Sequence, residues 1–185
     1  MIVGEERSAE QNKSSQRGNQ VRVLAEATVM IALASVLYVI RIYTLPEGGS
    51  VTLGSMIPLI LLSLRRGLKV GVTAGVVLGF VVLYLEPFIF NPIQVLLDYP
   101  IAFGALGLAG LLKRQPIAGV GLGILGRFFA HFLSGIIFFA SFAPVGMNPV
   151  LYSAIYNGTY LGIEFVISAG IMFLLLRRRI LEIYL

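Results

Sequence analysis

Six apolar stretches fill most of this 185-residue chain, and short segments rich in charge, glycine or proline separate them. Hydrophobic residues make up 57% of the chain and charged residues only 12%, well below the quarter that is usual in soluble domains. A water-soluble fold could not solvate such a surface. The sequence therefore predicts an integral membrane protein, long enough for six spans of about 20 residues with short loops.

The predicted spans are bounded by charged or turn-forming residues. They cover residues 23–43, 55–64, 70–85, 93–112, 117–139 and 150–176. The second is too short to cross the hydrocarbon core unless it begins in the preceding loop. In the third, Gly71, Gly75 and Gly79 form a stripe that favours close helix packing.

These spans predict an all-α membrane protein, a compact bundle of six transmembrane helices over residues 21–185. Residues 1–20 are polar and lack the apolar core of a signal peptide, so we expect a disordered cytoplasmic tail there.

Lysine and arginine are distributed unevenly between the two ends of the predicted spans. With the N-terminus in the cytoplasm and six crossings, the basic clusters at Arg65-Arg66, Lys113-Arg114 and Arg177–Arg179 all lie inside. Glu47 and Glu86 then lie in outer loops. Cytoplasmic loops carry such an excess of positive charge, so we expect both termini in the cytoplasm of a multi-pass cell-membrane protein. This topology explains the net charge of +5 without invoking nucleic acid.

A few polar residues lie inside the apolar stretches. Arg127 and His131 are four residues apart and share a helix face, and Asp98-Tyr99-Pro100 interrupts another span. Ionisable groups are costly in lipid, so these side chains should face protein or a wet cavity.

The positions of the polar residues along the predicted spans indicate a pocket that opens to the outside of the membrane. Asp98, His131, Tyr152 and Asn157 all fall in the outer half of the predicted bundle, together with several Phe rings. The loop over residues 44–54 lies above them. Its three glycines allow unusual backbone shapes, so we expect a lid there; they are Gly48, Gly49 and Gly54.

One carboxylate surrounded by aromatic rings suits a small, cationic, aromatic ligand. Asp98 would offset the positive charge, and the rings would stack on the ligand with some cation–π attraction. In the alternative interpretation, Asp98 pairs with Arg127 or His131 and only joins helices.

Several chemistries are disfavoured by the residues present. The chain has no cysteine and one histidine, which cannot form a usual structural metal site. No glycine-rich phosphate loop with its lysine is found. His131 and Ser134 lie three apart on one helix, a poor geometry for nucleophilic attack. We therefore expect neither an enzyme nor a cofactor.

Five segments resemble the thiamine-binding S-component of energy-coupling-factor (ECF) vitamin transporters, and the similarity covers nearly all of residues 22–178. Together and in this order they are specific. The segments are Gly48–Gly54, Leu61–Gly67, Asp98–Phe103, His131–Gly135 and Tyr152–Thr159.

The resemblance implies a six-helix subunit that captures extracellular thiamine with high affinity beneath the first loop. It also implies partnership with a transmembrane coupling subunit and two cytoplasmic ATPases, which supply energy that this chain cannot.

The resemblance also implies roles for individual residues. An acidic–Tyr pair that contacts the vitamin falls on Asp98 and Tyr99, and a His and an aromatic residue that sandwich the thiazolium fall on His131 and Phe139. The remaining matches are Tyr152, Asn157 and the basic Arg127.

This chain departs from the family pattern at some of these positions. Some members have Glu, Trp and Lys where Asp98, Phe139 and Arg127 stand. The family couples through alanines four apart on the first helix, and here the nearest match is Thr28 and Ala32.

Two other functions stay open. One is an S-component for another vitamin or a thiamine precursor. The other is a self-sufficient small-cation transporter that uses Glu26 or Glu164 as a proton carrier.

Overall fold

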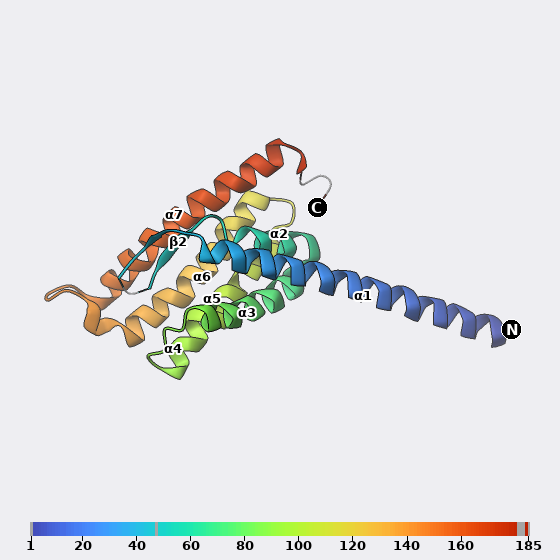
Figure 1. The fold of residues 1–185 in the computed structure, drawn as a ribbon, viewed down its shortest axis with the longest axis horizontal. Helices are drawn as coiled ribbons and strands as arrows, with labels where there is room; N and C mark the ends of the chain where they lie inside the picture. The colour runs from blue at the N-terminus through green and yellow to red at the C-terminus, as the bar shows by residue number, and fades with distance from the viewer. Residues whose placement is uncertain (1, 47, 181–183, 185) are drawn as a thin grey trace.

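The computed structural model describes residues 2–46, 48–180 and 184, and it is a bundle of helices with one small hairpin (Figure 1). Five helical segments of the described chain are long and apolar enough to cross a membrane: 15–39, 68–85, 92–111, 116–138 and 149–177. The ten-residue helix α2 (Ile57–Arg66) completes the bundle. The expected all-α membrane fold is confirmed.

Three long helices follow the predicted spans closely: α3 (Leu68–Leu85), α6 (Pro116–Phe138) and α7 (Pro149–Arg177). The first helix, α1 (Ile2–Val39), ends before the predicted boundary at residue 43, because residues 41–44 form a strand. Pro116 and Pro149 each lie at the start of a helix, where the missing N–H has no intrahelical partner to lose.

The N-terminal segment differs from the expected disordered tail. In the structure residues 2–20 continue α1 without a break, and this extension projects beyond the bundle (Figure 1). The segment has no proline, and its only glycines are Gly4 and Gly18, so its sequence contains no strong stop signal for the helix that begins in the membrane.

Helix α2 explains why the second apolar stretch is so short. Seven of its ten residues are buried, including Ile60 and Leu62, which have no exposed surface. It therefore lies inside the bundle as a core helix and ends at Arg65 and Arg66. A hydrophobic stretch of this length is typical of a buried helix, so the chain crosses the bundle here with α2 together with the buried strand segment that precedes it.

The fourth span is not a regular helix. It consists of α4 (Pro92–Leu96), a π-helical turn η1 (Leu97–Ile101), α5 (Ala102–Ala105) and a 3₁₀ segment η2 (Leu106–Leu111). Pro100 lies in the π turn, and the N–H of Ala102 reaches back five residues to the carbonyl of Leu97. A proline lacks the N–H of a regular ladder, and π turns of this kind frequently occur at functional sites.

The glycine stripe of α3 brings this irregular span close. A Cβ on Gly75 would lie 2.3 Å from the carbonyl oxygen of Phe103, and one on Gly79 would lie 2.6 Å from that of Tyr99. The expected packing role of these glycines is confirmed, because the two backbones nearly touch where η1 and α5 cross α3.

The loop after α1 contains a hairpin that the sequence did not predict. Strands β1 (Arg41–Thr44) and β2 (Ser50–Thr52) pair antiparallel, with β1 exposed and β2 buried. A short 3₁₀ turn, η3 (Ala140–Phe142), follows α6. Figure 1 shows the hairpin, α4 and the α6–α7 connection at one end of the bundle, and the α1 extension and the end of α7 at the other.

Replacing Gly75 should destabilise the protein. The methyl group in Gly75→Ala has no space against the Phe103–Gly104 backbone, and overpacking of this kind costs about 1–3 kcal/mol. The melting temperature in detergent would measure the loss. Gly170→Ala on α7 is the matched control, because nothing lies within 4 Å of the position that its methyl group would take. Equal melting temperatures for both variants would contradict the close contact.

Candidate ligand-binding site

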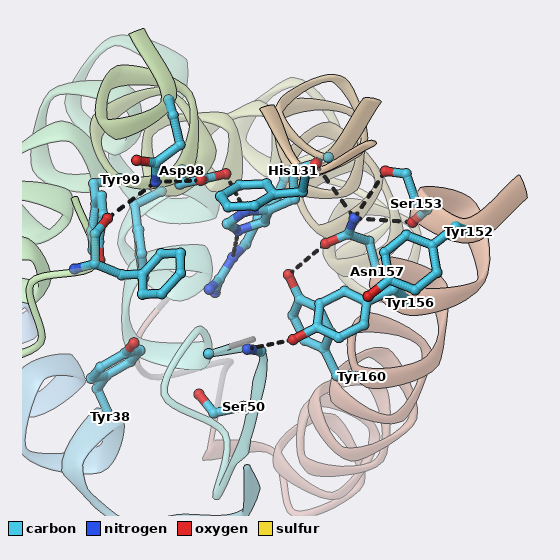
Figure 2. Close-up of a pocket in the computed structure, with 18 residues that line it drawn as sticks. Tyr38, Ser50, Asp98, Tyr99, His131, Tyr152, Ser153, Tyr156, Asn157 and Tyr160 are labelled. Atoms are coloured by element: carbon cyan, nitrogen blue, oxygen red, sulfur yellow. Dashed lines mark hydrogen bonds and ion pairs between the residues drawn. The ribbon is translucent and has the colours of Figure 1, made fainter. Parts of the chain in front are cut away.

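A cavity lies between the hairpin and the helices α1, α6, α7 and the irregular fourth span (Figure 2). All seven side chains that the sequence indicated as ligand contacts line it, and so do Gly48 and Gly49. The seven are Asp98, Tyr99, Arg127, His131, Phe139, Tyr152 and Asn157. The fold therefore brings together residues that are as far apart as 109 positions, from Gly48 to Asn157.

Asp98 lies in the π turn η1 and makes three hydrogen bonds. Its Oδ1 lies 3.0 Å from Nδ1 of His131, and its Oδ2 accepts from Gln94 (2.7 Å) and from Ser134 (2.9 Å). An ionised carboxylate has about four lone-pair positions, so one acceptor position remains for another group. The carboxylate thus joins helices and borders the cavity at once, which combines the two interpretations left open by the sequence.

Arg127 fixes the hydrogen-bonding state of His131. The Nε–H of Arg127 donates to Nε2 of His131 over 3.2 Å. Arginine has no acceptor, so Nε2 must be unprotonated, and Nδ1 carries the proton that it donates to Asp98. The imidazole is therefore neutral, and the chain Arg127–His131–Asp98 contains one positive and one negative charge.

The Arg127 side chain is only 6% exposed, and its guanidinium lies over the ring of Phe103 at 4.2 Å. The cation–π attraction to this ring offsets part of the free-energy cost of removing the guanidinium from water.

Helix α7 supplies an amide and three phenols. Asn157 Nδ2 donates to the carbonyl of Ser153 (3.0 Å), and its Oδ1 accepts from the hydroxyl of Tyr160 (3.1 Å). Tyr152 and Tyr156 pack ring to ring at 6.0 Å along the same face. The spacing of four residues places these tyrosines one turn apart, so their rings lie next to each other on the α7 side of the cavity.

The hairpin covers the cavity and is tied to α7 at two points. The N–H of Gly49 donates to the hydroxyl of Tyr156 over 3.0 Å. Further along β2, the N–H and the hydroxyl of Thr52 both donate to Oε1 of Glu164, over 2.5 and 2.6 Å. Gly49 also packs tightly against the ring of Tyr160, which leaves no space for a side chain.

Gly54 does not line the cavity. It lies just before α2 with a φ of +78°, and a Cβ there would come within 2.6 Å of Ile171. Its role in the structure is to turn the chain tightly beneath α7, so only the other two lid glycines border the cavity.

On the side of the cavity opposite α7, the rings of Phe88, Phe90 and Phe139 cluster together, and we call this cluster the aromatic wall. Phe139 packs against Phe88 and Phe90 with ring centroids 5.9 and 5.7 Å apart. The hydroxyl of Tyr99 accepts from the N–H of Phe88 (2.9 Å) and donates to the carbonyl of Glu86 (2.8 Å). Tyr99 thus holds the loop after α3 in place, in addition to lining the cavity.

Sequence reasoning missed several cavity residues. Gln94 is one turn before Asp98 and Tyr156 one turn after Tyr152, so helical spacing could have indicated both. Tyr38, Ser50 and Phe103 carried no such signal, because their contact with the cavity depends on the path of α1, β2 and α5.

The sequence also left open whether Arg127 pairs with Glu164. Instead Arg127 bonds to His131, and Glu164 bonds to Thr52. Within the described chain, Oε2 of Glu164 has no hydrogen-bond partner.

The fold and the cavity define a small multi-pass membrane protein with a polar and aromatic site enclosed near one end of the bundle. The chain belongs to the family described as thiamine transporter protein (Thia_YuaJ), which matches residues 24–183. This confirms the resemblance drawn from the five sequence segments.

Two curated relatives have the name thiamine transporter ThiT. The protein of Bacillus subtilis is 34% identical, over 89% of this chain and 92% of the relative. That of Lacticaseibacillus paracasei is 32% identical, over 77% of this chain and 81% of the relative. Both names describe transporters, which confirms the expectation of a non-enzymatic protein.

A solved structure of ThiT from Listeria monocytogenes has the same fold. Its TM-score is 0.79, with 24% sequence identity, over 86% of this chain and 96% of that one.

The protonation of His131 can be measured directly, because it is the only histidine of the chain. We expect long-range ¹H–¹⁵N spectra to show a protonated Nδ1 and an unprotonated Nε2. Arg127→Met removes the donor to Nε2 but keeps the Asp98 acceptor, so Nδ1 should stay protonated while Nε2 becomes free to take up a second proton. A wild-type protein with the proton on Nε2 would contradict the Arg127–His131–Asp98 geometry.

Proposed function

We propose that this chain captures thiamine in the cavity beneath the hairpin, as the substrate-binding subunit of an ECF importer. The observation that carries the proposal is the Asp98–His131–Arg127 chain at the edge of an aromatic cavity, in a member of a thiamine transporter family. A small cationic, aromatic ligand fits this combination of one carboxylate with many rings.

Thiamine carries one positive charge on its thiazolium ring, and the charges of the cavity favour one orientation. The cation should lie near Asp98 rather than near Arg127, because like charges repel strongly where water is excluded. The free acceptor position of Asp98 would face it. His131 and Phe139 would hold the thiazolium between their rings, with some cation–π gain.

The aminopyrimidine would then lie toward α7. The carbonyl oxygen of Asn157 uses one lone pair for Tyr160, which leaves a second to accept from the ligand's amino group. Tyr152 offers a ring and a hydroxyl on the same side. These contacts would distinguish thiamine from cations that have no second ring.

Entry of the ligand requires the hairpin that covers the cavity to open, and we assign this motion to the loop over residues 44–54. Gly48 has a φ of +88°, which suits a flexible turn at the tip of the hairpin. The bond from Gly49 to Tyr156 is a contact that opening would break.

The distribution of charge supports a cytoplasmic N-terminus. Glu26 of α1 pairs with Arg65 and Arg66 at the end of α2, on the side opposite the hairpin. The cavity then faces outward. The chain has no cysteine, so single cysteines introduced as Ser15→Cys and Ser141→Cys should react with an impermeant label from the cytoplasmic and outer sides respectively. Labelling of both from one side would contradict this topology.

Asp98→Asn should weaken thiamine binding about tenfold to hundredfold while the protein stays folded, because it removes the charge that offsets the cation. Calorimetric titration of the detergent-purified protein measures this. Intrinsic tryptophan fluorescence cannot be used, because the chain has no Trp.

Glu26→Gln is the matched control for this titration, because it makes the same chemical change at the far end of the bundle and should bind like the wild type. Unchanged affinity in Asp98→Asn would refute the role of Asp98, and a wild-type protein that does not bind thiamine would refute the function. Competition with uncharged hydroxymethylpyrimidine tests the precursor alternative.

We further propose that the chain works with a transmembrane coupling subunit and two cytoplasmic ATPases. Thr28 and Ala32 lie on an exposed face of α1, where small side chains permit close approach of another helix. This face would form the coupling surface.

Ala32→Phe should leave thiamine affinity unchanged and lower uptake at least about tenfold in liposomes that also contain the coupling subunit and ATPases, because a large ring prevents close helix contact. Val166→Phe on the exposed face of α7 is the control, with normal uptake expected. Uptake by this chain without ATPases would contradict the proposal and favour a self-sufficient transporter.

A further inference from the structure

Gln94 is a buried polar side chain beside the cavity that none of the binding roles above uses. It lies in α4, one turn before Asp98, and has no exposed surface. Its amide makes four hydrogen bonds, so both the oxygen and the nitrogen are fully engaged. Buried amides are costly unless satisfied in this way.

Three of the four bonds hold the loop between α3 and α4. The oxygen of Gln94 accepts from the N–H groups of Phe90 (3.0 Å) and Asn91 (3.4 Å). The nitrogen donates to the carbonyl of Phe88 over 3.2 Å. The rings that this backbone carries, Phe88 and Phe90, are those that pack on Phe139 and form the aromatic wall.

The fourth bond goes to the carboxylate. The second N–H of Gln94 donates to Oδ2 of Asp98 over 2.7 Å, the shortest of the three hydrogen bonds of Asp98. The other two bonds come from His131 and Ser134 on α6. Gln94 therefore connects Asp98 to the loop that forms the opposite wall of the cavity.

We propose that Gln94 is a positioning residue that holds the Asp98 carboxylate and the aromatic wall in a fixed relation to each other. A cation offset by Asp98 is then covered by Phe88 and Phe139 in the same geometry, so charge recognition and ring contact occur together. This inference rests on the proposed function, because it requires a cationic aromatic ligand in the cavity.

The chemistry of the position supports an amide. A primary amide supplies two donors and an acceptor at one end of the side chain, which matches the two carbonyl or carboxylate acceptors and the two backbone donors. Glutamate would lose both donors and place a second carboxylate against Asp98. Methionine has nearly the same length but neither donor nor comparable acceptor.

The test is a double-mutant cycle measured by thiamine titration of the full chain: wild type, Gln94→Met, Asp98→Asn and the double variant. We expect Gln94→Met alone to weaken binding about tenfold, and to weaken it less than about threefold when Asp98→Asn is already present. The same loss in both backgrounds would overturn the proposal, because a merely structural role would not depend on the charge at position 98. Gln115→Met, at an exposed glutamine before α6, is the control and should bind like the wild type.

A second measurement does not need the ligand and separates this inference from the proposed function. The chain has no tryptophan, so Phe90→Trp places a single fluorophore in the loop. Asp98→Asn should shift its emission when Gln94 is present and leave it unchanged with Gln94→Met. Equal shifts with and without Gln94 would overturn the proposal even if thiamine binds. If Gln94→Met does not yield folded protein, Gln94→Asn replaces it, because the shorter amide adds no charge beside Asp98 and cannot span the same distance between the carboxylate and the loop.

Discussion

The pairing of Asp98 with Arg127 through a neutral His131 is the interaction on which the rest of the site depends. Both charges lie inside a membrane bundle, where an isolated ion is very costly. Because one is negative and the other positive, this chain of residues gives the cavity no net charge. Removing any of the three would leave a buried group without its partner. The pairing therefore fixes the irregular fourth span against α6.

This arrangement requires the fourth span to come unusually close to its neighbours. The glycines of α3 let the backbone of η1 and α5 approach within contact distance, and the π turn at Pro100 alters the direction of the side chains around it. Asp98 and Tyr99 lie in that turn. A regular helix with larger side chains on α3 would hold the carboxylate further from His131. The approach of the fourth span to α3 therefore allows both the close helix packing and the contact between Asp98 and His131.

The walls of the cavity depend on hydrogen bonds from backbone groups to side chains on other elements. Thr52 and Gly49 of the hairpin bond to Glu164 and Tyr156 of α7, and the loop after α3 bonds to Gln94 and Tyr99. Each bond satisfies a backbone group inside the bundle, as membrane proteins require. The hairpin is therefore held by hydrogen bonds to α7, whereas the aromatic wall is held by hydrogen bonds to the fourth span. A ligand between them would contact both.

The sequence by itself determined the membrane character, the long spans and the polar residues that must avoid lipid, because these follow from the local cost of exposing charge to hydrocarbon. It also indicated Asp98, Arg127 and His131 as neighbours of one cavity. Only the tertiary structure decided that residues 41–44 pair with residues 50–52 in a hairpin, that α2 is a core helix, and that Gln94 connects Asp98 to the aromatic wall. The partners of Glu164 and the place of Gly54 outside the cavity were likewise decided there. These features depend on which distant backbone groups remain unpaired after the helices pack, and no local pattern encodes that.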